Sequence, residues 1–102
     1  MRLIWTRPAI AIRRMIFERI KSEDPAAAKR IVTRLRDRAN DLLVLPHQGR
    51  KGRVEGTFEL VVGRTPYLLI FARRQEDIVI LTILHHARQW PPVADGERTE
   101  PA

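Results

Sequence analysis

The spacing of apolar residues changes once along this chain, and that change limits the folds available to it. Between residues 9 and 42, apolar side chains recur every three or four positions, which is the period of an amphipathic helix. Between residues 54 and 85 they alternate with polar residues or run continuously, as in strands with one or two buried faces. The 102 residues suffice for one compact domain. The sequence therefore predicts a single α+β domain.

The first half divides into two helices with a short break between them. Isoleucines spaced four apart between residues 12 and 20 form one apolar stripe. After the break, Asp24 is a good N-cap and Pro25 a good first-turn residue for a second helix that reaches about Leu45. Two amphipathic helices with a short connection predict an antiparallel hairpin.

The second half predicts three strands in series joined by short polar turns. They are expected at residues 54–62, 67–72 and 78–85, and a further short strand is expected at 2–6. The basic, glycine-containing segment 46–53 is expected to be a loop with no secondary structure of its own. The helical hairpin can bury its apolar stripes against this antiparallel meander.

Two of the strands carry predictions about their faces. In the segment 54–62 one face is apolar and Glu59 lies on the polar one. In the last strand, strict alternation places Ile78, Ile80 and Leu84 on one face and Val79, Leu81 and Ile83 on the other.

Charge and composition restrict the partners and the chemistry. The chain has 19 lysines and arginines against 12 acidic residues, a net charge of +7 that favours nucleic acid, the ribosome or an acidic protein as partner. Cysteine is absent, which excludes disulfides, thiolate nucleophiles and cysteine zinc sites. No apolar run of about 18 residues is present, so neither a membrane span nor a secretion signal is predicted and a cytoplasmic protein is expected.

The composition changes near the C-terminus. From residue 91 the chain is rich in proline, acidic and small residues and offers little apolar surface to bury. We therefore expect a domain over residues 1–90 and a flexible tail over residues 91–102.

Four segments of the second half resemble a known family. They are PHQGRKGR at 46–53, GTFELVV at 56–62, TPYLLIF at 65–71 and ILTILHHARQWP at 80–91, and DPAAA at 24–28 matches the usual start of the second helix. Over about residues 1–91 the chain resembles the ParE/RelE toxins of bacterial type II toxin–antitoxin systems. The resemblance implies a β-α-α-β-β-β fold and a cytoplasmic toxin that is silenced by a cognate antitoxin.

The resemblance leaves the activity open between two branches. ParE-like members inhibit DNA gyrase by binding it, whereas RelE-like members cleave messenger RNA on the ribosome. A third possibility is a non-toxic nucleic-acid-binding domain, although the aromatic residues mostly occupy core positions and offer no stacking platform. Antitoxins of the family commonly lay an acidic segment across the toxin, and arginines on both predicted helices could receive one.

The candidate catalytic residues depend on the RelE-like alternative. Lys51 and Arg53 lie about where RelE-like nucleases carry lysines, and Arg88 resembles a C-terminal arginine of both branches. Either His85 or His86 could act as acid or base, but adjacent strand residues face opposite ways, so only one can belong to a given site. The alternatives are a solvated loop for Lys51 and Arg53, and one histidine packed in the core.

Two departures favour the ParE-like branch. The strand aromatic Tyr67 is followed by Leu68, where the RelE-like pattern usually has an arginine. Tyr67 is also the only tyrosine, so the late tyrosine of RelE-like nucleases has no counterpart. The resemblance, together with these departures, therefore implies a toxin that acts by binding its target, and we expect no cofactor or metal.

Further residues are candidate contacts for the target or the antitoxin. They are Glu59, Arg64, Arg73, Arg88 and Trp90. Glu59 could also act as a general base, and the remaining alternative for it is an ion pair with an arginine on a neighbouring strand. For Trp90 the alternative is that its ring covers the edge of the core.

Overall fold

The computed structural model describes residues 1–86, and its elements follow the predicted order. They are β1 (Leu3–Trp5), α1 (Arg7–Lys21), α2 (Pro25–Val44), β2 (Arg50–Lys51), β3 (Phe58–Val61), β4 (Tyr67–Arg74) and β5 (Asp77–His85). The predicted helical hairpin and the three later strands are confirmed. Arg88, Trp90 and the proposed tail lie outside the described residues.

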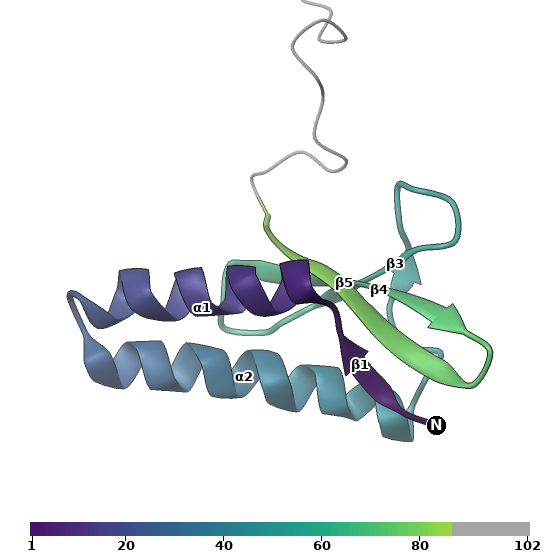
Figure 1. The fold of residues 1–102 in the computed structure, drawn as a ribbon, viewed down its shortest axis with the longest axis horizontal. Helices are drawn as coiled ribbons and strands as arrows, with labels where there is room; N and C mark the ends of the chain where they lie inside the picture. The colour runs from purple at the N-terminus through teal and green to yellow at the C-terminus, as the bar shows by residue number, and fades with distance from the viewer. Residues whose placement is uncertain (87–102) are drawn as a thin grey trace, which may run out of the picture.

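The strands form one five-stranded mixed sheet in the order β1-β5-β4-β3-β2. The pairs from β2 to β5 are antiparallel, whereas β1 lies parallel to β5. Figure 1 shows both helices lying side by side across the sheet. No helix in the part of the chain that the structure describes is long and apolar enough to cross a membrane.

Both helices begin as their sequences predict. The Thr6 hydroxyl accepts a hydrogen bond from the backbone N–H of Ala9 at 3.3 Å, and the Asp24 carboxylate accepts one from Ala27 at 3.0 Å. A proline occupies the first turn of each helix, where its missing N–H has no helical partner to lose. These caps and prolines set the start of each helix locally.

Loss of the Asp24 cap should destabilise the domain measurably. Asp24→Ala removes the acceptor for the Ala27 N–H, and we expect the free energy of unfolding to fall by about 1 kcal/mol. Urea titration followed by far-UV circular dichroism measures the change. Asp24→Asn keeps a capping oxygen and is the matched control. An alanine variant as stable as the asparagine variant would contradict this account of the helix start.

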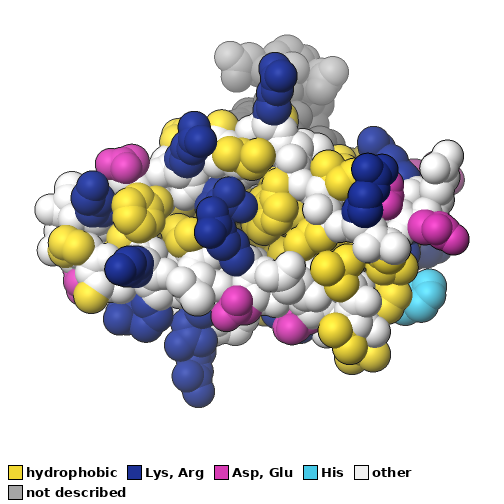
Figure 2. Space-filling model, turned by 60° about the horizontal axis from the view of Figure 1, so that its bottom comes forward, with side chains coloured by type: hydrophobic (Ala, Val, Ile, Leu, Met, Phe, Trp, Pro, Cys, Tyr) yellow, Lys and Arg dark blue, Asp and Glu magenta, His cyan; other side chains and the backbone are white. Residues whose placement is uncertain are grey.

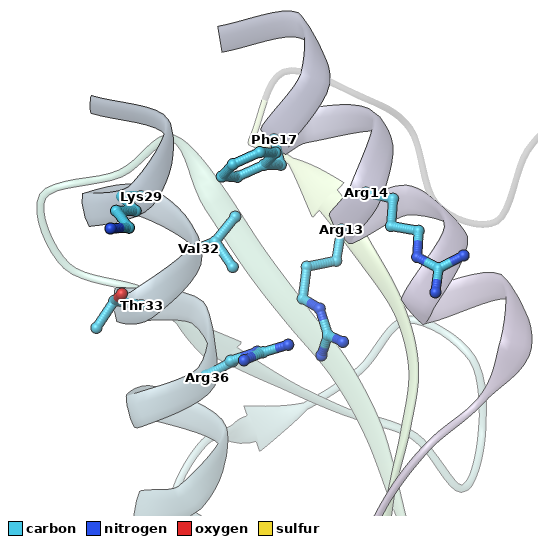
Figure 3. Close-up of a pocket in the computed structure, with 7 residues that line it drawn as sticks. All are labelled: Arg13, Arg14, Phe17, Lys29, Val32, Thr33 and Arg36. Atoms are coloured by element: carbon cyan, nitrogen blue, oxygen red, sulfur yellow. The ribbon is translucent and has the colours of Figure 1, made fainter. Parts of the chain in front are cut away.

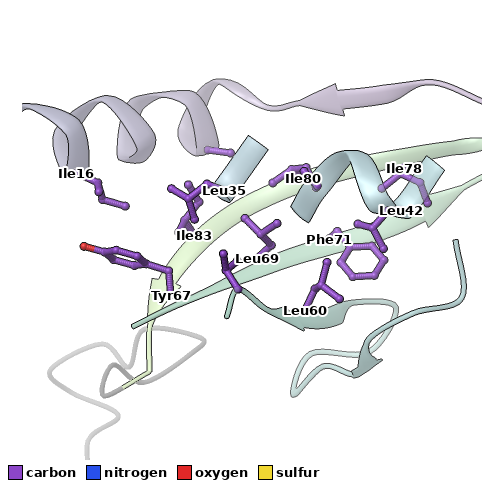
Figure 4. Packing of buried hydrophobic residues seen from close by; sticks show 13 residues of the cluster. Ile16, Leu35, Leu42, Leu60, Tyr67, Leu69, Phe71, Ile78, Ile80 and Ile83 are labelled. Atoms are coloured by element: carbon purple, nitrogen blue, oxygen red, sulfur yellow. The ribbon is translucent and has the colours of Figure 1, made fainter. Parts of the chain in front are cut away.

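The core lies between the helices and one face of the sheet (Figure 4). Leu35 and Leu42 of α2 pack there against Leu69 and Phe71 of β4 and Ile80 of β5, all fully buried. Ile16 of α1 and Tyr67 of β4 belong to the same cluster. The helical stripes and the sheet face therefore form one continuous core.

A β-bulge corrects the predicted alternation in the last strand. Ile70 pairs with Thr82 but Phe71 pairs with Ile80, so Leu81 is the extra residue on β5. As a result Ile83 joins Ile80 in the core. The prediction that these two residues lie on opposite faces was wrong because the inserted residue reverses the parity.

The segment around the basic loop also differs from its prediction. Arg50 and Lys51 form the short edge strand β2, which pairs with Glu59 and Phe58, so the segment is not wholly a loop. The following strand is shorter than predicted because residues 54–57 form a turn, in which the Thr57 hydroxyl donates to the Val54 carbonyl at 2.6 Å. Backbone pairing across the sheet, which local polarity does not reveal, creates β2.

Candidate functional site

A groove between α1 and α2 gathers cationic side chains from both helices (Figure 3). We call it the interhelical groove, and its lining residues are Arg13, Arg14, Phe17, Lys29, Val32, Thr33 and Arg36. Four of the seven side chains are cationic and none is acidic. Phe17 and Val32 supply apolar surface between the charges.

Helical periodicity brings these residues together. Arg13 and Phe17 lie one turn apart on α1, and the α2 members at 29, 32, 33 and 36 recur every three or four residues. The sequence analysis noted arginines on both helices but did not single out these positions. The signal that could have identified them is the run of cations on one stripe of each helix.

Within residues 1–86, no carboxylate forms an ion pair with the cations of the groove. Ion pairs among residues 1–86 involve other arginines: Arg2, Arg38, Arg50 and Arg53. Burial in the groove, followed by repulsion from Arg36 and Arg14, lowers the pKa of the Arg13 guanidinium from its ordinary value. The interhelical groove therefore favours an anionic ligand.

The Trp5 ring orients the Arg13 side chain. The Arg13 guanidinium carbon lies 4.5 Å from the ring centroid of Trp5, a cation–π contact. On the face shown in Figure 2, groups of lysine and arginine side chains alternate with apolar surface. This combination can bind a ligand that carries both carboxylates and apolar side chains.

A second charged cluster lies at the β2 edge of the sheet. The Glu59 side chain is 3% exposed and pairs with Arg50 at 3.1 Å and Arg53 at 3.5 Å. Arg50 and Glu59 are register partners on adjacent strands. The ion pair of Glu59 with an arginine on a neighbouring strand is thus confirmed, although its carboxylate is buried rather than solvated.

Arg73 and Arg64, two of the predicted contact residues, have different surroundings. Arg73 donates hydrogen bonds to the carbonyls of Pro46 and Gln48, and its guanidinium carbon lies 3.9 Å from the ring centroid of Phe58. Burial lowers the pKa of Arg73 from its ordinary value. Arg64 is exposed in the turn before β4 with a positive φ of 62°. Arg73 therefore anchors the segment after α2, and Arg64 faces solvent.

The two histidines occupy different environments. His85 ends β5, with its ring edge-on to Tyr67 at a centroid distance of 5.8 Å. The Tyr67 hydroxyl in turn accepts a hydrogen bond from the Arg19 guanidinium at 2.7 Å. His86 follows the strand and is exposed, and its backbone N–H donates to the Pro66 carbonyl at 2.9 Å.

The sheet register separates the candidate catalytic residues. Lys51 pairs with Phe58, which pairs with Phe71, whereas His85 pairs with Tyr67. Tyr67 and Phe71 are four residues apart on one strand, which corresponds to about 13 Å. Lys51 and His85 are therefore separated along the strand direction and also by the intervening strands β3 and β4, and they do not share a site. Nor does any group of three potential metal ligands occur among the described residues.

Comparison with known proteins identifies the family. Residues 3–90 match the model of the ParE toxin of the type II toxin–antitoxin system parDE. The chain belongs to the ParE toxin family. A candidate toxin of Sinorhizobium fredii, Y4kP, is 38% identical over 92 residues, which are 90% of this chain and 95% of that protein.

A solved structure agrees with this assignment. The chromosomal ParDE toxin–antitoxin system from P. aeruginosa contains a chain that superposes with a TM-score of 0.76 at 27% identity. The match covers 83% of this chain and 95% of that one. The protein is thus a ParE-type toxin of a toxin–antitoxin system.

Proposed function

We propose that this toxin inhibits growth by binding DNA gyrase, and that its antitoxin silences it by laying an acidic, amphipathic segment in the interhelical groove. The observation that carries the antitoxin part is that the cations of that groove, which lie beside apolar surface, have no ion-pair partner within residues 1–86. The gyrase part comes from the family resemblance and from the departures from the nuclease pattern.

The chemistry of the interhelical groove suits a protein ligand. Carboxylates of the antitoxin would form charged hydrogen bonds with Arg13, Arg14 and Arg36, which are stronger than neutral ones. Apolar side chains between those carboxylates would pack on Phe17 and Val32. Arginines beside an apolar floor are typical of the residues that dominate binding energy at interfaces.

Action by binding is also supported by the environment of the family's nuclease positions. Cleavage of RNA needs acid, base and charge-stabilising groups gathered around one phosphate. Leu68, at the position of the usual arginine, is 3% exposed, and Tyr67 is a core residue at 4%. A toxin that binds its target needs no such group.

Supercoiling by purified gyrase tests the target. We expect a molar excess of the toxin to inhibit supercoiling of relaxed plasmid, and an equimolar amount of the antitoxin to restore it. Cleavage of ribosome-bound messenger RNA, measured with the same preparation, should stay at background. Unaffected gyrase together with ribosome-dependent cleavage would overturn the proposed target and favour the RelE-like activity.

A further inference from the structure

We propose that the hairpin of β2 and β3 is a second binding site, which holds the phosphodiester backbone of a nucleic acid on Arg50 and Arg53. Buried Glu59 acts as a positioning residue for both arginines. This proposal goes beyond the proposed function, because it concerns a different surface from the interhelical groove and a different class of ligand.

Glu59 holds both guanidinium groups while leaving most of their donors unused. Its Oε1 accepts from Arg50 through Nε at 3.2 Å and pairs with Nη2 at 3.1 Å, and its Oε2 lies 3.5 Å from the Nε of Arg53. The carboxylate is 3% exposed, but the two arginine side chains are 66% and 46% exposed. A guanidinium has five N–H donors, so several on each arginine remain available to solvent.

The hairpin that carries these arginines is internally braced. The Gly52 N–H donates to the Thr57 carbonyl at 2.8 Å, and Thr57 binds Val54 through both its hydroxyl and its N–H. A Cβ at Gly52 would overlap the Thr57 side chain, so this close approach requires glycine. Figure 1 shows the loop before β3 projecting beyond the sheet. Arg50 and Arg53 are therefore presented in a fixed arrangement, which reduces the entropy lost on binding.

The charge of this cluster is unbalanced in favour of an oxyanion. One carboxylate faces two guanidinium groups. Lys51 is also exposed, but as the adjacent strand residue it faces the opposite way from Arg50 and does not belong to this cluster. Two arginines that share one carboxylate retain a net positive charge, and their planar forks match the geometry of phosphate.

The surroundings favour a nucleic acid over a protein. Large exposed apolar side chains of the described chain occur at Met1, Met15, residues 43–45 and Val61, but not on the hairpin segment 49–57. Protein interfaces usually have an apolar centre, whereas nucleic-acid interfaces are polar and positively charged. The interhelical groove, with its aromatic and aliphatic floor, has the character of a protein interface, whereas the hairpin has that of a nucleic-acid interface.

Binding of the full-length chain to short fluorescent duplex DNA, and separately to single-stranded RNA, tests the site. Fluorescence anisotropy should show Arg50→Ala/Arg53→Ala binding about 10-fold more weakly, with a salt slope lower by about 2. The matched control is Arg7→Ala/Arg30→Ala, which removes the same charge from exposed positions on the helices. For the control we expect a loss of less than about 3-fold.

Glu59→Gln separates a positioned site from general attraction. This variant raises the net charge, so unspecific electrostatics predicts tighter binding, whereas our proposal predicts binding about 3-fold weaker or worse. Arg50→Lys/Arg53→Lys keeps the charge and should also bind more weakly, because lysine lacks the bidentate fork. The lysine pair decides the question if Glu59→Gln does not fold by circular dichroism.

The two nucleic acids identify the ligand. If Glu59→Gln and Arg50→Lys/Arg53→Lys both bind more weakly to the duplex, to the RNA or to both, the result supports the site and assigns its partner. Equal or tighter binding by the lysine pair on both nucleic acids, or equal losses for the two alanine pairs, would overturn it. Gyrase inhibition is measured separately, so failure here leaves the proposed function intact.

Discussion

Replacing Arg13 and Arg36 with glutamate should abolish silencing of the toxin by its antitoxin. The two substitutions remove the opposed cations of the interhelical groove and place carboxylates against an acidic segment. A hydrogen bond to a charged group contributes about 1.5–3 kcal/mol, so two lost bonds correspond to a loss of affinity of at least about 100-fold. Isothermal titration calorimetry of the purified pair measures this loss directly.

The same charge change elsewhere is the control. Arg7→Glu/Arg30→Glu alters the net charge equally at exposed positions that do not line the interhelical groove. We expect this control to change antitoxin affinity by less than about 10-fold, mainly through a slower association rate. In the gyrase assay, the Arg13→Glu/Arg36→Glu variant should still inhibit supercoiling when antitoxin is present. Undiminished antitoxin affinity of the groove variant would place the antitoxin on another surface.

Replacing Phe71 with alanine should bring the domain close to unfolding. Phe71 is fully buried, its ring lies 5.6 Å from that of Phe58, and its edge would meet any Cβ added at Gly49. Truncating such a residue leaves a cavity and costs about 3–5 kcal/mol. Domains of this size are stable by about 5–15 kcal/mol, so the loss is a large share of the total.

Urea unfolding monitored by circular dichroism measures this effect. The control is Leu45→Ala, because Leu45 is 60% exposed just after α2 and its truncation creates no cavity. We expect the control to change the free energy of unfolding by less than about 0.5 kcal/mol. Similar values for the two variants would show that the core does not centre on β4.

We expect the two basic surfaces to bind different partners, a difference that net charge alone does not reveal. The interhelical groove combines cations with an apolar floor and has no internal carboxylate. The hairpin combines exposed cations with a buried anchoring carboxylate. Substitutions in one surface should therefore leave binding at the other unchanged, and a variant of each kind can be tested in the same preparation.

Much of the architecture was predictable from signals that act over a few residues. The apolar periods distinguished helices from strands, and Asp24 marked the start of α2 because a cap acts within a single turn. The pairing of Glu59 with an arginine was also predictable, since a carboxylate on a strand of a basic protein has many possible partners. The resemblance was enough to name the nuclease candidates, but it could not predict that Lys51 and His85 lie apart in the sheet.

Local chemistry thus specified the helices, the core strands and the surplus of positive charge. Long-range pairing specified the parallel contact of β1 with β5, the short strand β2 and the bulge at Leu81. Likewise, Arg13 and Arg36 meet only because the two helices pack side by side. Backbone hydrogen bonds between distant segments depend on which partner is available in space, and a pattern read along the chain carries no record of that partner.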